Sequence, residues 1–179
     1  MTFANQLTLI RLVAVVPVMA ALYIQFPGNR AVATVVYVAA ILTDYLDGIL
    51  ARRTGKVTAF GKLMDSVADK AVIVSLFFAL VAEGSMPPWM AAIMVVREFA
   101  VTGLRMVALE ADEVIAANNW GKAKMISQSA AVLILLLGYA EVGYWAMLVA
   151  TILTLLSGWS YLKDTPRILA ATAGQDRKL

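Results

Sequence analysis

Six long apolar runs, separated by short charged or turn-forming segments, constrain the fold of this chain more than any other feature. A membrane-spanning helix needs about 20 predominantly apolar residues, and an average soluble domain carries roughly 25% charged residues. Here 61% of the 179 residues are hydrophobic and 15% are charged. The apolar runs cover residues 7–24, 31–50, about 58–82, 87–107, 125–140 and 144–162. We therefore predict an all-α integral membrane protein, a bundle of six transmembrane helices with a polar cavity open to the cytoplasm.

The length leaves room for one domain. Six spans of about 20 residues use about 120 positions, so we predict a single membrane domain at residues 1–169. Residues 170–179 are predicted to form a mobile cytoplasmic tail. Pro27-Gly28, Pro87-Pro88 and Gly143 predict turns between the runs.

The distribution of basic residues predicts the orientation of the bundle. Lysine and arginine gather after the second, fourth and sixth runs, and cytoplasmic loops of membrane proteins are enriched in these residues. Arg30 is the exception, on a predicted outer loop. Both termini are therefore predicted to be cytoplasmic. Exposed aromatic belts are expected at the outer ends of the helices, at Trp89, Tyr139, Tyr144 and Trp145.

The chain contains no cysteine and no histidine, which excludes several kinds of chemistry. Disulfides, thiolate metal sites, cysteine nucleophiles and imidazole acid–base catalysis all need one of these residues. A bound metal would have oxygen ligands, which favours hard cations such as Mg²⁺, Mn²⁺ or Ca²⁺. The formal net charge of +3 is small, and no nucleic-acid partner is expected.

Four aspartates interrupt the second and third apolar runs. Asp44 and Asp47 are three residues apart, and Asp65 and Asp69 are four apart, so each pair shares one helix face. If the two helices run antiparallel about the turn near residues 53–58, all four carboxylates lie at a similar depth beneath the cytoplasmic surface. Carboxylates this close repel one another unless some are protonated or cations neutralise them, and two divalent cations would balance four negative charges.

Two other interpretations of the aspartates remain open. They could be ion-pair partners of nearby basic side chains at the membrane face, or they could line an ion or proton pathway. Gly48 and Gly61 lie beside the aspartates, where a residue without a side chain admits either a ligand or a neighbouring helix. The basic side chains available for pairing are Arg52, Arg53, Lys62 and Lys70.

The same segment resembles the signature of the CDP-alcohol phosphotransferase family, and every defining position is present. The pattern reads Asp44-x-x-Asp47-Gly48-x-x-Ala51-Arg52, then eight residues, then Gly61-x-x-x-Asp65-x-x-x-Asp69. The resemblance implies a six-helix membrane bundle with a cytoplasm-facing site. It also implies that an alcohol oxygen attacks the phosphorus of a CDP-linked donor and that CMP leaves.

The resemblance assigns roles to these positions. Asp44, Asp47 and Asp65 would hold two Mg²⁺ or Mn²⁺ ions, and Asp69 would complete the site and act as the general base on the acceptor hydroxyl. The CDP part of the donor would be bound by Gly48, Ala51, Arg52 and Gly61, together with Asn5 and Thr8 near the N-terminus.

Three further segments resemble the members of this family that use CDP-diacylglycerol and sn-glycerol 3-phosphate. They are Asn5-Gln6-Leu7-Thr8-x-x-Arg11 with Pro17, the run Arg97-Glu98 to Arg105, and Gly121-Lys122-x-Lys124-x-x-x-Gln128. Ser66 stands where a proline is common and Met125 where a threonine is common, and neither change removes a charged group. The resemblance also implies a bacterial plasma-membrane location and a homodimer among membrane lipids.

The acceptor's phosphate requires fixed cationic donors. Arg105, Lys122 and Lys124 lie at the predicted cytoplasmic ends of the fourth and fifth spans, and Arg97 lies deeper in the fourth. Lys122 and Lys124 equally suit ordinary positive flanks of a membrane helix, and Arg97 equally suits a structural pair with Glu98. The acceptor itself stays open between glycerol 3-phosphate, inositol phosphate, serine and phosphatidylglycerol, and an ion-coupled transporter remains the alternative outside this family.

Overall fold

The computed structural model describes the backbone of residues 13–176, except residues 14, 25, 55–58 and 111–118. Side chains are described over the same residues, except those of 44–54, 59–69, 109, 110, 162 and 164–176.

The described backbone is helical throughout and contains no strand, which confirms the all-α prediction for this part of the chain. A first helical stretch covers residues 15–23. It is followed by α2 (Asn29–Thr54), α3 (Ala59–Ala82), α4 (Pro88–Glu110), α5 (Asn119–Leu136) and α6 (Ala140–Asp176). α6 continues as a helix through most of the predicted tail, whose mobility remains a prediction.

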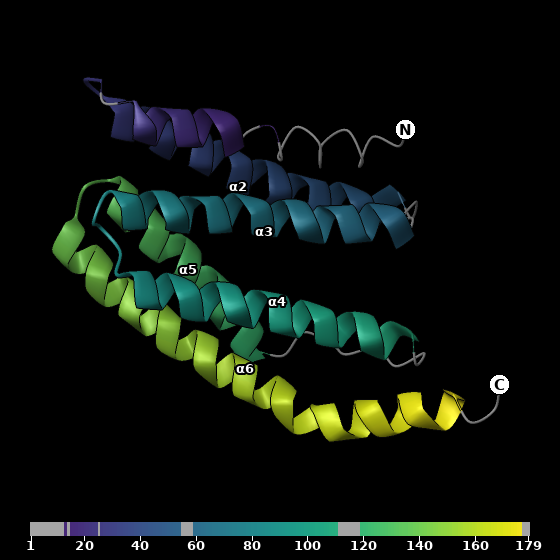
Figure 1. The fold of residues 1–179 in the computed structure, drawn as a ribbon. Coiled ribbons are helices and arrows are strands. Elements are labelled where there is room, and N and C mark those ends of the chain that lie inside the picture. Colours follow the sequence, from purple (N-terminus) through teal and green to yellow (C-terminus); the bar gives the residue numbers. More distant parts are fainter. Residues whose placement is uncertain (1–12, 14, 25, 55–58, 111–118, 177–179) are drawn as a thin grey trace.

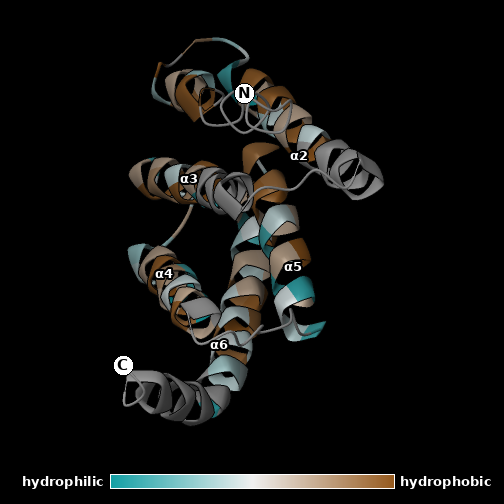
Figure 2. Cartoon of the chain, turned by 90° about the vertical axis from the view of Figure 1, so that its right-hand side faces the viewer, coloured by the Kyte–Doolittle hydropathy of each residue, from teal (hydrophilic) through white to brown (hydrophobic). Residues whose placement is uncertain are grey.

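The helices run up and down in a single bundle (Figure 1). α5 and α6 pack against each other, α4 packs on α6, α3 on α4, and α2 on α5. The end-on view in Figure 2 shows α3 and α4 on one side of the α5–α6 pair. Figure 1 also shows α6 changing direction in its C-terminal part, which contains Pro166, because a proline inside a helix removes a backbone hydrogen bond and bends the axis.

The turns at Pro27-Gly28 and at residues 83–87 lie where the sequence predicts them. The predicted turn at Gly143 is wrong, because Gly143 lies inside α6 and the α5–α6 connection is at Gly138. Gly138 has a φ of 90°, a left-handed conformation that glycine adopts without strain. Gly143 serves close packing instead, since a Cβ atom there would overlap the side chain of Leu135 on α5.

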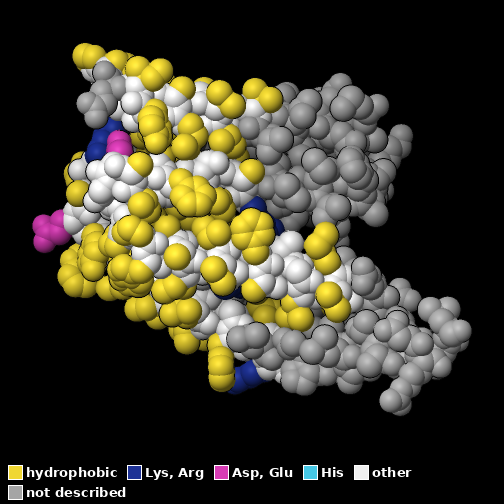
Figure 3. Space-filling view, viewed as in Figure 1, with side chains coloured by type: hydrophobic (Ala, Val, Ile, Leu, Met, Phe, Trp, Pro, Cys, Tyr) yellow, Lys and Arg dark blue, Asp and Glu magenta, His cyan; other side chains and the backbone are white. Residues whose placement is uncertain are grey.

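The core formed by the described side chains includes a dense group near the α3–α4 and α5–α6 connections. Leu76, Phe77 and Leu80 of α3 meet methionines of α4 and α6 and leucines of α5, all of them buried. Many other large apolar side chains are exposed, and Figure 3 shows hydrophobic side chains over most of the described part of one face.

One helical segment, Ala140–Tyr161, is long and apolar enough by itself to cross a membrane, among the residues that the structure describes. Asn29–Thr43 and Lys70–Ala82 are shorter apolar helical segments. α4 carries Arg97, Glu98 and Arg105 within its apolar sequence and ends at Glu110.

Candidate active site

The four aspartates of the sequence motif lie on neighbouring helices in the chain, Asp44 and Asp47 on α2 and Asp65 and Asp69 on α3. With a rise of 1.5 Å per residue, their backbones lie about 9–15 Å from the helix ends that flank the α2–α3 connection. The similar depth of the four carboxylates remains a prediction.

The side chains of these aspartates lie outside the described part of the chain, so the predicted metal site remains a prediction. Among the side chains that are described, no group of three or more acidic residues could hold a metal ion. The donor set itself suits Mg²⁺ or Mn²⁺, because paired carboxylates at helical spacings of three and four present only oxygen ligands. Of the predicted donor-binding residues, Gly48, Ala51 and Arg52 lie on α2 and Gly61 on α3, whereas Asn5 and Thr8 are outside the described residues.

A second group of charged side chains is described in full, where α4, α5 and α6 meet. Glu98 of α4 and Lys124 of α5 are both buried, with 9% and 6% of their surface exposed. The Lys124 ammonium donates to Glu98 Oε1, and Arg97 Nη1 lies 3.4 Å from the same oxygen. Glu98 therefore holds two cations from two helices, and the predicted Arg97–Glu98 pair is present.

Two side chains of α6 hold the arginines of α4. Arg97 Nη2 donates to Ser157 Oγ at 2.5 Å, and Arg105 Nη2 donates to Tyr161 Oη at 2.6 Å. The guanidinium carbons of Arg97 and Arg105 lie 5.5 Å and 5.2 Å from the centre of the Tyr161 ring, within the range of a cation–π contact. Ser157 and Tyr161 are four residues apart on α6, so one helix face supports both arginines.

Each arginine keeps one donor without a partner. The Nε atoms of Arg97 and Arg105 are buried and have no hydrogen-bond partner among the described residues. A buried donor without a partner costs about 1–3 kcal/mol, and more for a charged group. An anion brought to this cluster would be attracted by the positive charge of both guanidinium groups.

The structure brings three of the four residues predicted to bind the acceptor phosphate into one cluster. Arg97 shares the Tyr161 ring with Arg105, and it shares Glu98 Oε1 with Lys124. Lys122 is exposed near the start of α5. Ser157 and Tyr161 were absent from the predicted site; the only signal for them was a pair of polar groups at helical spacing within an apolar helix.

A motif of paired aspartates and a cluster of partly buried arginines are together typical of enzymes that act on phosphorylated substrates. Comparison with known proteins makes the class specific: the chain belongs to the CDP-alcohol phosphatidyltransferase family, whose model matches residues 1–156. The family resemblance drawn from the aspartate motif is thereby confirmed.

Relatives from several bacteria cover most of the chain. A CDP-diacylglycerol--glycerol-3-phosphate 3-phosphatidyltransferase of Bacillus subtilis is 38% identical over 145 residues, which cover 75% of this chain and 74% of the relative. A protein of the same name from Rickettsia bellii is 31% identical over 167 residues, covering 89% and 92%. A probable phosphatidylglycerophosphate synthase of Mycobacterium tuberculosis is 35% identical over 166 residues, covering 89% and 79%.

Proposed function

We propose that this chain transfers the phosphatidyl group of CDP-diacylglycerol to sn-glycerol 3-phosphate, giving phosphatidylglycerol phosphate and CMP. The names of the relatives support the reaction. The choice of glycerol 3-phosphate as acceptor is supported by Arg97 and Arg105 of α4. Both arginines donate to side chains of α6, and their buried Nε atoms have no partner among the described residues.

Positive charge exceeds negative charge among the paired side chains of the described cluster. Arg97, Arg105 and Lys124 are cationic, and Glu98 is the carboxylate that pairs with Arg97 and Lys124. A phosphate monoester at neutral pH carries about −1.5 to −2. Serine, as an acceptor without a phosphate, would leave this excess charge uncompensated in a buried place.

The proposed acceptor site uses all four predicted cations, at different distances from the phosphate. Arg105 and Arg97 bind the phosphate through their free guanidinium donors, in the planar geometry that suits phosphate oxygens. Lys124 has three N–H donors and uses one on Glu98, so it can complete the site from α5. Lys122, which is exposed, attracts the acceptor from the water phase.

The transfer itself is proposed to occur at the aspartate motif. Asp44, Asp47 and Asp65 would hold two Mg²⁺ or Mn²⁺ ions, which neutralise charge on the donor's diphosphate when bound. Asp69 accepts the proton of the acceptor hydroxyl as its oxygen forms a bond to the phosphorus that bears the lipid. The bond from that phosphorus to CMP breaks, and CMP leaves.

The CDP part of the donor is proposed to lie along α2 and the start of α3. Gly48 and Gly61 allow it to approach the helix backbone, and Ala51, one turn from Gly48, keeps that face small. Arg52 supplies positive charge for the diphosphate. Asn5 and Thr8 are proposed to complete this donor site from the N-terminal segment.

A six-span membrane placement, with both termini and the site on the cytoplasmic side, is proposed for the bundle. The exposed apolar surface supports it, as does the position of four exposed aromatic side chains near the α3–α4 and α5–α6 connections. The exposed cations Lys122 and Lys163 lie toward the opposite end of their helices. We propose a bacterial plasma-membrane enzyme that works as a homodimer and has no nucleic-acid partner. The four aromatic side chains are Trp89, Tyr139, Tyr144 and Trp145.

The test is release of CMP by the purified protein in liposomes that contain CDP-diacylglycerol. Glycerol 3-phosphate, inositol phosphate and serine are compared as acceptors, each with Mg²⁺, with Mn²⁺ and with EDTA. We expect metal-dependent release with glycerol 3-phosphate alone. Release with a different acceptor would overturn the acceptor assignment, and no release from folded protein with any acceptor would overturn the reaction.

A further inference from the structure

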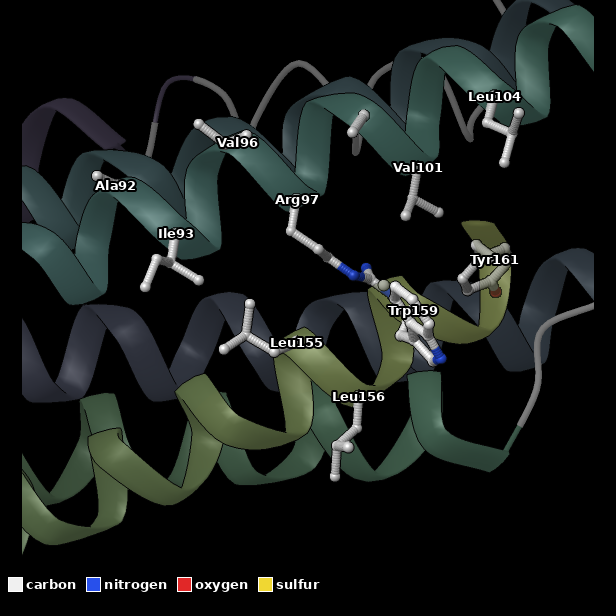
Figure 4. A pocket seen from close by; sticks show the side chains of 12 residues that line it. Ala92, Ile93, Val96, Arg97, Val101, Leu104, Leu155, Leu156, Trp159 and Tyr161 are labelled. Carbon is white, nitrogen blue, oxygen red and sulfur yellow. The ribbon is translucent and has the colours of Figure 1, made fainter. Parts of the chain in front are cut away.

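An apolar groove runs between α4 and α6, and its lining includes Arg97 but neither Glu98 nor Lys124. It encloses about 740 Å³, a volume within the usual range of small-ligand sites. Figure 4 shows Ile93, Val101 and Leu104 of α4 pointing toward α6, which contributes Leu155 and Trp159 to the lining. Most of its lining is aliphatic, so the ligand that fits this groove is a hydrocarbon.

The dimensions of the groove suit one lipid chain. From Ala92 to Leu104 the α4 wall rises by about 18 Å, slightly more than the roughly 15 Å of one bilayer leaflet, half of the hydrocarbon thickness. A helix from another protein, about 10–12 Å across with its side chains, would lie over a groove of this volume and not fill it.

The end of the groove toward the proposed cytoplasmic surface is marked by an aromatic and a cationic side chain. Trp159 lines the groove and is 63% exposed. Lys163 is exposed four residues later, so it lies on the same face of α6, just beyond the groove. A lysine next to an interfacial tryptophan attracts anionic lipid headgroups.

We propose that this groove binds one acyl chain of an anionic phospholipid of the cytoplasmic leaflet, with the headgroup at Lys163. The inference rests on the membrane placement proposed above and not on the proposed reaction. The chain would lie along α4 from Leu104 toward Ala92, and Trp159 would contact its first carbons.

The bound acyl chain would also cover the side chain of Arg97. Gly158 lets the stem of Arg97 lie flat on α6, since a Cβ at this position would be 3.3 Å from Arg97 Cγ. The stem therefore lines the groove while the guanidinium group turns to Ser157 and Glu98. An acyl chain in the groove excludes water from this side of the charged cluster, where ion pairs are stronger when water is absent.

The test uses two variants that each retain one tryptophan, either Trp159 in the groove or Trp145 outside it on the same helix. The two side chains are similarly exposed, at 63% and 59%. Detergent-solubilised protein is titrated with phosphatidylglycerol or phosphatidylcholine that carries bromine on matched acyl chains, and quenching of tryptophan fluorescence is measured. We expect Trp159 to reach half-maximal quenching at about fivefold less phosphatidylglycerol than phosphatidylcholine, the factor for one lysine near an anionic surface. Trp145 should respond equally to both lipids.

Two substitutions with matched controls test the parts of the site. Lys163→Gln should remove the preference for phosphatidylglycerol, while Lys122→Gln, an equal change of charge on α5, should keep it. Ala100→Phe fills the groove and should abolish saturable quenching of Trp159. Ala130→Phe, on the exposed surface of α5, should leave it unchanged.

Several outcomes overturn the proposal. Equal responses of Trp159 and Trp145 would mean that the groove is ordinary lipid-facing surface. Saturable quenching without a preference for phosphatidylglycerol would remove the role of Lys163. If light scattering shows a dimer and Trp159 is quenched only after it dissociates, the occupant is a second copy of the chain. Failure of the CMP-release assay alone would refute the reaction and leave these binding results unaffected.

Discussion

The buried pair of Glu98 and Lys124 allows a quantitative test of how a buried ion pair contributes to the stability of this bundle. Glu98→Gln leaves Lys124 and Arg97 close together without their shared anion. Removing one partner of a buried ion pair typically costs about 3–5 kcal/mol. We expect the upper part of this range for Glu98→Gln, because two cations lose their partner, the buried Lys124 and the partly buried Arg97.

Lys124→Met should cost less than Glu98→Gln, because Arg97 still lies 3.4 Å from the Glu98 carboxylate and compensates its charge. The double variant should lose less stability than Glu98→Gln alone, since replacing both members of a buried pair is often close to neutral. The free energy of unfolding is measured for the wild type, both single variants and the double variant by denaturant titration in mixed micelles. Leu133→Ala and Leu148→Ala, two partly buried apolar positions of α5 and α6, serve as a control pair without charge.

The KM for glycerol 3-phosphate, measured on the same four proteins, separates the two proposed contacts of Lys124. A double variant of restored stability but raised KM would support its contact with the acceptor phosphate. Strictly additive losses of stability in the charged pair would refute the reasoning, because they would mean that Glu98 and Lys124 do not stabilise each other.

Three further predictions concern single contacts. Tyr161→Phe removes the oxygen that accepts from Arg105 Nη2, and hydrogen bonds to charged groups contribute about 1.5–3 kcal/mol. The KM for glycerol 3-phosphate should therefore rise at least about tenfold, while the KM for CDP-diacylglycerol stays constant. Equal changes in both KM values would contradict the assignment of Arg105 to the acceptor. Asp69→Asn removes the proposed general base and should lower kcat by about 10²–10⁴-fold in the CMP-release assay. The free energy of unfolding should not change. A variant that keeps full kcat would exclude Asp69 as the base. Gly143→Ala places a methyl group against Leu135 and should cost about 1–3 kcal/mol of stability. The additional substitution Leu135→Ala should recover part of this loss in a thermal unfolding experiment. No recovery would mean that contact with Leu135 does not cause the loss.

Much of the helix pattern could be predicted because apolar runs and turn residues act locally. The predicted second, third and fourth spans agree with α2, α3 and α4 to within a few residues, and Pro27-Gly28 forms the predicted turn. The prediction failed at Gly143, because a glycine can either break a helix or allow two helices to pack closely. Only the position of Leu135 on the neighbouring helix distinguishes these two roles.

The candidate site, too, could be predicted only in part from the sequence. The aspartate motif and the family were readable from sequence, because both depend on residues at fixed spacings within one short segment, and the family match confirms that interpretation. The contacts of Arg97 and Arg105 with Ser157 and Tyr161 were not readable, because these residues lie 60 and 56 positions apart in the chain. Helical periodicity tells which residues share a face but not which helix that face meets.

By itself, the sequence determined a chain of apolar helices, a four-aspartate motif and membership of a phosphatidyltransferase family, since composition and local spacing suffice for these. Only the tertiary structure decided that Lys124 pairs with Glu98, that α6 holds the two arginines of α4, and that a groove lies beside them. Buried charges select their partners by distance and geometry, and in this bundle the packing of α4, α5 and α6 determines both.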